Sequence, residues 1–311
     1  MDSMAVVFEG PERLDLRRLD LVAPQDDDVV VDVAWSGIST GTERLLWSGR
    51  MPNFPGMGYP LVPGYESVGR VVATGASATS RLGETVFVPG STCFKDARGL
   101  FGGAAHRIVA PSARVVRIQE RLGARGILLA LAATAHHAVA GGPAPDLIVG
   151  HGALGRLIAR VTMALGAPAP TVWETNAARR ADSLGYPVLD PSDDQRRDYR
   201  VIVDVSGDCG LLDTLFQRLA RGGEVVLAGF YEERLSFSFP TAFMREARVR
   251  VAAEWKPDDL KAVLALMRVG RMTLDELITH HDSAENAAEA YRTAFTDSAC
   301  LKMVLDWRGC A

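Results

Sequence analysis

The sequence lacks the features that mark several protein classes. Its four cysteines are scattered among 311 residues and none forms a Cys-x-x-Cys pair, which argues against a disulfide scaffold and a four-cysteine zinc lobe. No segment approaches about 18 uninterrupted apolar residues, so we expect no membrane-spanning helix. The net charge of −4 and the lack of a Lys/Arg run argue against nucleic acid or an anionic membrane as a partner.

The remaining composition is that of an ordinary globular protein. Hydrophobic residues make up 48% and charged residues 23%, and the length predicts about two domains with real cores. Residues 1–10 show no basic segment followed by an apolar stretch, so we expect no signal peptide. A cytoplasmic enzyme fits these observations.

The first third of the chain reads as short strands and turns. Runs rich in β-branched residues, each ended by Gly or Pro, lie at 29–35, 67–73 and 85–88. This punctuation predicts a barrel or a sandwich. A long loop at 47–64, rich in Pro, Gly, Met and aromatic residues, is of the kind that tends to be functional.

From about residue 121 the pattern changes to alternating strands and helices. The expected strands and helices, in chain order, are 127–139 (helix), 146–149 (strand), 154–165 (helix), 171–173 (strand), 177–184 (helix), 201–205 (strand), 211–219 (helix) and 224–228 (strand). This rhythm predicts a parallel, doubly wound sheet. Helices near 258–269 and 284–294 and a strand at 301–305 complete the chain.

A glycine-rich turn follows the first strand of this sheet and opens a helix. Its residues are Gly150, His151, Gly152, Ala153, Leu154 and Gly155. The three glycines permit a sharp turn, close approach of a pyrophosphate and close helix–strand packing, and the helix N-terminus offers N–H groups to phosphate. The turn therefore predicts a dinucleotide site.

The residues after the later strands refine this prediction. Glu174 ends the second strand, where a carboxylate binds the adenosine ribose hydroxyls and repels a 2′-phosphate, which favours NAD over NADP. Arg179 and Arg180 would instead serve NADP, unless they lie on a solvated helix face. Two further strand ends leave room for the nicotinamide ribose, with Ser206, Gly207, Gly229 and Phe230.

Taken in order, these segments resemble the medium-chain dehydrogenase/reductase superfamily over nearly the whole chain. Residues 63–71 are similar to its Pro-x-Gly-His-Glu-x-x-Gly-x-Val segment, 221–229 to its late Rossmann strand, and 278–291 to its C-terminal return. The resemblance implies an α/β fold with a GroES-like β-barrel catalytic domain, residues 1–120 completed by 271–311. It also implies a Rossmann domain, a doubly wound parallel sheet of residues 121–270, with the active site in the cleft between the two.

The sequence departs from the zinc-binding members of this superfamily. Thr40 stands at the position of their cysteine ligand, Tyr65 at their histidine, and the third ligand falls near Leu129 or Ala130. These side chains do not bind zinc tetrahedrally. We therefore predict no metal, with one alternative: a site rebuilt from Glu43, Glu66 and either His136 or His137.

Without zinc, other groups must take the proton of an alcohol. Tyr65 is the candidate base, with a pKa lowered by a nearby nicotinamide cation, or else a tyrosine that only fills space. Thr40 is a candidate donor to the substrate oxygen, and Thr134 a candidate contact of the nicotinamide. His136 and His137 are adjacent on a helix and point about 100° apart, so one of them is a candidate proton shuttle. Lys302 matches a family position that reaches the cofactor phosphates.

A closer resemblance is to the branch of this superfamily that oxidises bacteriochlorophyllides, carried by residues 38–43 and by the loop 47–66. It implies a tetrapyrrole substrate whose 3-(1-hydroxyethyl) group becomes 3-acetyl, with NAD⁺ as acceptor. The candidate substrate contacts are the arginines and the large apolar residues of this region: Arg44, Trp47, Arg50, Phe54, Met57 and Tyr59. Otherwise the aromatic residues pack on the barrel and the arginines face water.

Two other functions stay open from the sequence. One is a zinc-free quinone or enone reductase of the same superfamily, which would usually prefer NADPH. The other is a non-catalytic nucleotide- or pigment-binding protein on the same fold. A twofold homodimer is the expected assembly.

Overall fold

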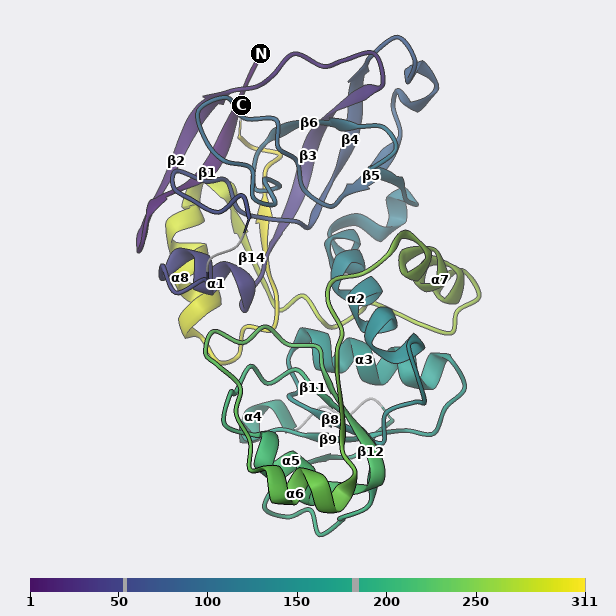
Figure 1. Ribbon diagram of the computed structural model, residues 1–311. Coiled ribbons are helices and arrows are strands. Elements are labelled where there is room, and N and C mark those ends of the chain that lie inside the picture. The colour runs from purple at the N-terminus through teal and green to yellow at the C-terminus, as the bar shows by residue number, and fades with distance from the viewer. Residues whose placement is uncertain (53–54, 181–184, 311) are drawn as a thin grey trace. The chain divides into compact units, whose positions relative to one another are not determined.

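The computed structural model describes residues 1–52, 55–180 and 185–310. The chain divides into two compact units, one of Met1–Ala130 with Asp275–Ala311 and one of Leu131–Leu274 (Figure 1). The sequence placed the corresponding boundaries at 120 and 270. Each unit has its own sheet.

A seven-stranded sheet dominates the first unit. Its order is β14-β15-β3-β4-β5-β7, with β6 paired to β3, and β1 and β2 form a separate antiparallel pair. The strands are β1 (Asp2–Gly10), β2 (Arg13–Asp20), β3 (Asp28–Ile38), β4 (Ser67–Thr74), β5 (Thr85–Val88), β6 (Arg107–Pro111), β7 (Val116–Arg117), β14 (His280–Ser283) and β15 (Met303–Asp306). β15 joins β3 antiparallel, so the C-terminal segment completes the N-terminal sheet.

Short helices border this sheet. They are α1 (Thr42–Trp47), α8 (Ala287–Thr296), η1 (Thr79–Arg81), η2 (Glu120–Leu128) and η3 (Ala284–Asn286). α1 follows β3 after a turn of three residues, and α8 lies beside it (Figure 1). Tyr291 of α8 donates a hydrogen bond to Glu43 of α1, which joins the two helices.

A six-stranded, all-parallel sheet forms the centre of the second unit. Its order is β10-β9-β8-β11-β12-β13. The strands are β8 (Leu147–Val149), β9 (Thr171–Trp173), β10 (Val188–Leu189), β11 (Tyr199–Asp204), β12 (Leu219–Leu227) and β13 (Arg248–Val251). The helices are α2 (Leu129–Ala140), α3 (Ala153–Ala164), α4 (Ala177–Arg180), α5 (Leu212–Arg218), α6 (Phe239–Arg245) and α7 (Pro257–Arg268). The strand order reverses between β8 and β11, the place where ligands bind in such sheets. The Rossmann-type, doubly wound sheet expected from the sequence is confirmed.

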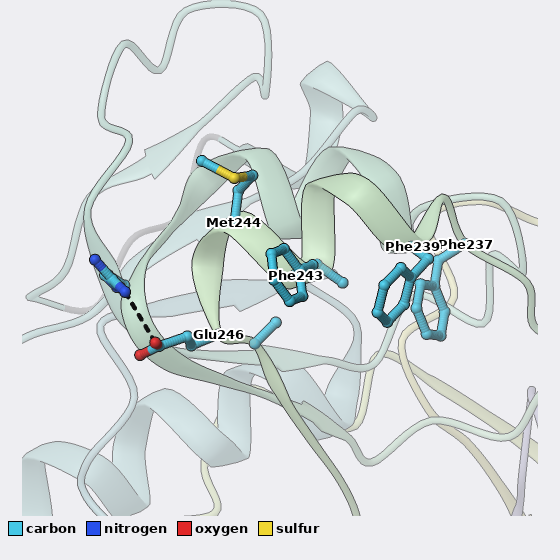
Figure 2. Close-up of a pocket in the computed structure, with 8 residues that line it drawn as sticks. Phe237, Phe239, Phe243, Met244 and Glu246 are labelled. Atoms are coloured by element: carbon cyan, nitrogen blue, oxygen red, sulfur yellow. Dashed lines mark hydrogen bonds and ion pairs between the residues drawn. The ribbon is translucent and has the colours of Figure 1, made fainter.

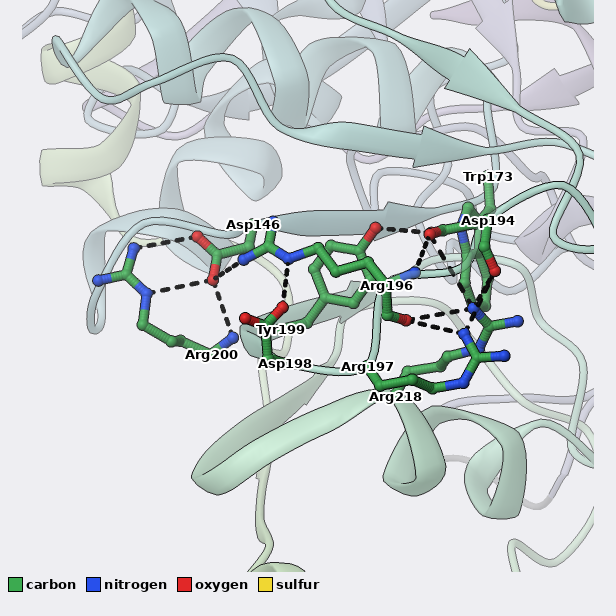
Figure 3. Close-up of polar contacts among 9 residues, drawn as sticks. All are labelled: Asp146, Trp173, Asp194, Arg196, Arg197, Asp198, Tyr199, Arg200 and Arg218. Carbon is green, nitrogen blue, oxygen red and sulfur yellow. Dashed lines mark hydrogen bonds and ion pairs between the residues drawn. The ribbon is translucent and has the colours of Figure 1, made fainter.

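A buried carboxylate links two strands of this second sheet, β9 and β11 (Figure 3). Asp194 accepts hydrogen bonds from Trp173 Nε1 and Tyr199 Oη, both at 2.6 Å. The guanidinium of Arg218 lies 5.0 Å from the centre of a Trp173 ring. Because Trp173 ends β9 and Tyr199 begins β11, the cluster fixes the strand end from which Glu174 continues.

One helical stretch of the described residues, Glu120–Ala140, is long and apolar enough to pass a length-and-composition test for a membrane span. The interior helix of a folded domain passes the same test, and 56% of the 18-residue window that passes it is buried. All four cysteines lie in the described part of the chain and are free thiols, three of them buried.

Candidate active site

The glycine-rich turn has the shape that a dinucleotide needs. Gly150 has φ +103°, and a Cβ on Gly155 would collide with the Gly150 carbonyl, so both positions require glycine. A Cβ on Gly152 would have no neighbour within 4 Å, and Gly152 caps α3 without a side-chain hydrogen bond. The start of α3, at Ala153 and Leu154, is half-buried and has no side-chain cap, which fits a pyrophosphate.

Glu174 lies directly beside this turn. Its carboxylate is largely buried and accepts hydrogen bonds from the backbone N–H of His151 at 3.1 Å and of Asn176 at 2.8 Å. His151 is fully buried, with one ring nitrogen 2.7 Å from the Arg179 carbonyl and the other 3.0 Å from the Tyr186 hydroxyl. Burial lowers the pKa of His151. The turn is therefore held to Glu174 through the His151 backbone, while the imidazole ties the turn to Arg179 and Tyr186.

The two arginines after Glu174 have partners within the protein. Arg180 Nη1 lies 2.8 Å from Asp190 Oδ2 and donates to the carbonyls of Glu174 and Thr175. Arg179 offers its carbonyl to His151 and to Arg156. Residues 181–184 of the expected helix lie outside the described residues.

The ends of β11 and β12 contain a carboxylate that the sequence did not single out. Asp204 is buried and accepts hydrogen bonds from Ser206 Oγ at 2.7 Å and from Tyr231 Oη at 2.9 Å. Burial raises the pKa of Asp204. Gly207 and Gly229 follow these strand ends, and Phe230 is exposed. An aspartate within the apolar run 201–205 was the available signal.

The adjacent histidines His136 and His137 both contact one carboxylate. His136 Nδ1 lies 2.7 Å from Asp259 Oδ1, and His137 Nδ1 lies 2.9 Å from Asp259 Oδ2. Asp259 lies near the start of α7. Each of its two carboxylate oxygens contacts one imidazole, so a single carboxylate reaches both neighbouring histidines of α2. A neutral imidazole that donates from Nδ1 leaves Nε2 as its acceptor. Thr134 lies one turn earlier on α2 and is partly buried.

The surroundings of Tyr65 determine the pKa of its phenol. It is partly buried, its ring meets Phe101 edge-on at 5.0 Å, and its hydroxyl donates to Ser39 Oγ at 2.7 Å. Burial raises the pKa of Tyr65 well above its usual value, and the negative charge of Glu66 adds to the effect. Tyr65 is therefore a neutral phenol in this structure, and the lowering of its pKa by a bound nicotinamide cation stays a prediction. Thr40 lies next to Ser39, in the turn before α1.

Glu43 is a second buried carboxylate close to Tyr65. It accepts hydrogen bonds from the Ser39 backbone N–H at 2.9 Å and from Tyr291 Oη at 2.7 Å. Burial raises the pKa of Glu43 to about 7, with the charge of Glu66 also raising it, while its hydrogen bonds and the charge of Lys302 lower it. Glu43 therefore titrates near neutral pH.

Glu66 and Lys302 form a fully buried ion pair. Glu66 is 0% and Lys302 1% exposed, and the ammonium contacts the Glu66 carboxylate. A Cβ on Gly37 would collide with the same carboxylate, so glycine there makes room for the pair. Lys302 was expected to reach cofactor phosphates; in this structure its ammonium lies against Glu66 instead.

These contacts bear on the alternative of a rebuilt metal site. Glu43 is held by Ser39 and Tyr291, and Glu66 contacts Lys302. Within residues 1–52, 55–180 and 185–310, no group of three or more His, Cys, Asp or Glu side chains is arranged to hold a metal ion.

The predicted substrate residues divide into packed and exposed groups. Three of them are partly buried against the hydrophobic core of the first unit: Trp47, Met57 and Tyr59. The ring centres of Trp47 and Phe295 lie 5.6 Å apart. Tyr59 also donates a hydrogen bond to the Leu46 carbonyl. Arg44 and Arg50 are exposed, and Phe54 lies outside the described residues.

The chain is similar to known proteins in sequence. Residues 25–120 match the alcohol dehydrogenase GroES-like domain. Over 318 aligned positions the chain is 57% identical to the 2-desacetyl-2-hydroxyethyl bacteriochlorophyllide A dehydrogenase of Cereibacter sphaeroides, with 100% of both chains covered.

The chain is also similar to solved structures. A short chain alcohol dehydrogenase of Escherichia coli CFT073, complexed with NADH, superposes with a TM-score of 0.84 at 19% identity, covering 98% of this chain and 99% of that one. A dehydrogenase of Sinorhizobium meliloti 1021, bound to NADP, does so with a TM-score of 0.83 at 20% identity and the same coverage. At these identities the likeness concerns the fold.

Proposed function

Because the chain belongs to the medium-chain dehydrogenase/reductase family, we propose that it oxidises the hydroxyethyl substituent of a bacteriochlorophyllide to an acetyl group. The observation that carries this proposal is the full-length similarity to an enzyme whose name states that substrate. The chain is an alcohol-type dehydrogenase with a GroES-like domain and a Rossmann-type sheet.

The cofactor of this oxidation is a nicotinamide dinucleotide, and we propose NAD⁺. The glycine cradle at Gly150–Gly155 and the uncapped start of α3 suit a pyrophosphate. Glu174 supports NAD over NADP, because a carboxylate there accepts hydrogen bonds from ribose hydroxyls and repels a 2′-phosphate. Arg180, which would favour NADP, is bonded to Asp190.

The nicotinamide, when bound, accepts the hydride from the carbinol carbon. We assign the hydroxyl proton to Tyr65, which is neutral and donates its own hydrogen to Ser39. Its oxygen keeps lone pairs that accept from an alcohol. Since a neutral phenol cannot hold a second proton, Tyr65 must release its own proton as it takes the substrate's. We further assign Thr40 to the substrate oxygen, Thr134 to the nicotinamide and His136 or His137 to proton exchange.

We propose that this chemistry proceeds without zinc. Thr40 and Tyr65 replace two of the family's ligands, and the nearby carboxylates of Glu43 and Glu66 are engaged by protein groups. Elemental analysis of the active protein tests this point. One zinc per chain, lost together with activity on chelation, would contradict it.

The loop at 47–64 is the proposed contact for the macrocycle. Trp47, Met57 and Tyr59 present partly buried apolar surface, and the exposed guanidinium groups of Arg44 and Arg50 suit a propionate. A large flat ligand needs a wide, mainly apolar surface with few charged groups, which this composition provides.

We propose a twofold homodimer built through the edge of the parallel sheet. β13 lies at that edge, and the neighbouring α6 exposes Phe239, Phe243 and Met244 by 67%, 65% and 72% (Figure 2). A second copy is the fitting occupant, because an open strand edge pairs with its own twofold mate while the apolar side chains beside it are covered.

The test of the proposed function is an absorbance assay. The purified chain is mixed with NAD⁺ and the hydroxyethyl pigment, and in parallel with NADP⁺. We expect a red-shifted acetyl product and a higher kcat/KM with NAD⁺. Pigment binding without turnover would favour a carrier, and turnover of a quinone or enone with NADPH would favour a reductase.

A further inference from the structure

The hydrogen bond between Tyr65 and Ser39 gives the phenol a defined direction. Tyr65 Oη is the donor and Ser39 Oγ the acceptor, at 2.7 Å. A hydroxyl that donates to one partner turns its lone pairs toward other donors. The Thr42 side chain also interacts with the phenol, and the lone pair that remains can accept from a substrate hydroxyl.

Ser39 is itself fixed from behind. Its backbone N–H donates to Glu43 Oε1 at 2.9 Å, and Tyr291 Oη donates to Glu43 Oε2 at 2.7 Å. Ser39, Glu43 and Tyr291 are all buried, whereas Tyr65 is partly accessible. The chain of contacts thus runs from the interior of the first unit to one reachable phenol.

A purely structural explanation covers only part of this arrangement. Glu43 stabilises the turn before α1 through the backbone N–H of Ser39, and any residue at position 39 other than proline would supply that N–H. The side-chain hydroxyl of Ser39 adds nothing to this turn. The hydroxyl instead accepts the hydrogen of the Tyr65 phenol.

We propose that Ser39 is a positioning residue for alcohol oxidation, which orients the Tyr65 hydroxyl. The inference rests on the proposed function. As the alcohol O–H bond breaks, its proton joins the Tyr65 oxygen, and the former phenolic proton passes to solvent water at the partly accessible Tyr65, so one proton leaves for each hydride transferred. Glu43 and Tyr291 hold Ser39 in place for this exchange.

The test compares three variants of Ser39 by steady-state kinetics with the hydroxyethyl pigment and NAD⁺. We expect Ser39→Ala to lower kcat by about tenfold or more, with the KM for NAD⁺ unchanged. Ser39→Cys replaces the hydroxyl with a weak thiol of similar size and is expected to lose activity as well, which covers the case of a poorly folded alanine variant. Ser39→Thr keeps a hydroxyl and is expected to retain more activity than Ser39→Cys.

The matched control is Ser91→Ala. Ser91 is a buried serine of the same unit whose hydroxyl donates to the Val109 carbonyl, so its loss changes stability and leaves kcat unchanged. In a Tyr65→Phe background, Ser39→Ala is expected to cause no further loss, because its effect passes through the phenol.

The outcomes separate the inference from the proposed function. If the unsubstituted chain does not oxidise the pigment, the proposed function fails and the inference fails with it. If the unsubstituted chain is active and Ser39→Ala matches Ser91→Ala, the inference alone is overturned. The inference would also be overturned if the losses of kcat from Ser39→Ala and Tyr65→Phe simply added in the double variant.

Discussion

Replacing Glu43 by Gln should change how the stability of the protein depends on pH. Burial raises the pKa of Glu43 in the folded chain to about 7, against an ordinary value of 4.5. Between these values the folded state holds a proton that the unfolded state releases. The contribution is fully present below pH 4.5 and is lost as the pH rises to about 7.

The size of this effect follows from the pKa difference. A difference of about 2.5, from 4.5 to about 7, corresponds to about 3 kcal/mol of unfolding free energy, of which about 2–3 kcal/mol falls between about pH 5 and pH 8. Glutamine cannot ionise, and its amide keeps an acceptor for the Ser39 N–H and a donor toward Tyr291. As the pH rises over this range, the unfolding free energy of Glu43→Gln should therefore increase by about 2–3 kcal/mol relative to that of the unsubstituted chain.

Urea denaturation of both proteins, followed by tryptophan fluorescence at about pH 5 and about pH 8, measures this difference. Other titrating groups, including Glu66, are present in both proteins and largely cancel. An identical pH dependence for the two proteins would show that the Glu43 carboxylate is charged throughout. The description of a buried, proton-holding network would then be wrong.

Three further predictions concern other parts of the chain. Lys302→Met should lower the unfolding free energy measured in urea by about 3–5 kcal/mol, because it leaves the Glu66 charge buried without its partner. Adding Glu66→Gln should restore most of this loss, and losses that simply add in the double variant would contradict the pairing. Glu174→Ala should raise kcat/KM for NADP⁺ relative to NAD⁺ by about tenfold, and an unchanged ratio would remove Glu174 from cofactor selection. Phe243→Glu should shift the protein toward the monomer in sedimentation, whereas an unchanged mass would exclude α6 from the contact.

Much of the fold could be predicted from the sequence because local patterns determine it. The apolar strands of the parallel sheet, such as β8 and β11, are bounded by glycines or polar residues, and their spacing predicts the alternation with helices. The pattern does not resolve β1, β2 or β13. β2 and β13 alternate charged with apolar residues, and α6 is too short for helical periodicity to show.

The candidate site was less predictable, because its chemistry depends on contacts between distant segments. The glycine turn is local and was found. Ser39 acquires its partner 26 residues away, and Glu43 its partner 248 residues away. The same applies to Asp259, which binds two histidines more than a hundred residues distant. The raised pKa of Tyr65 likewise depends on its burial and on the charge of Glu66, which the sequence pattern does not show.

The most direct test of the account is the stoichiometry of a complete conversion. The purified chain, freed of added metal, is given NAD⁺ and a limiting amount of hydroxyethyl bacteriochlorophyllide, and both products are measured by absorbance. We expect one NADH for each acetyl pigment formed, and a loss of about tenfold or more in kcat for Tyr65→Phe with NAD⁺ affinity unchanged. An absence of NADH and of acetyl product, with pigment and nucleotide both bound, would contradict the account.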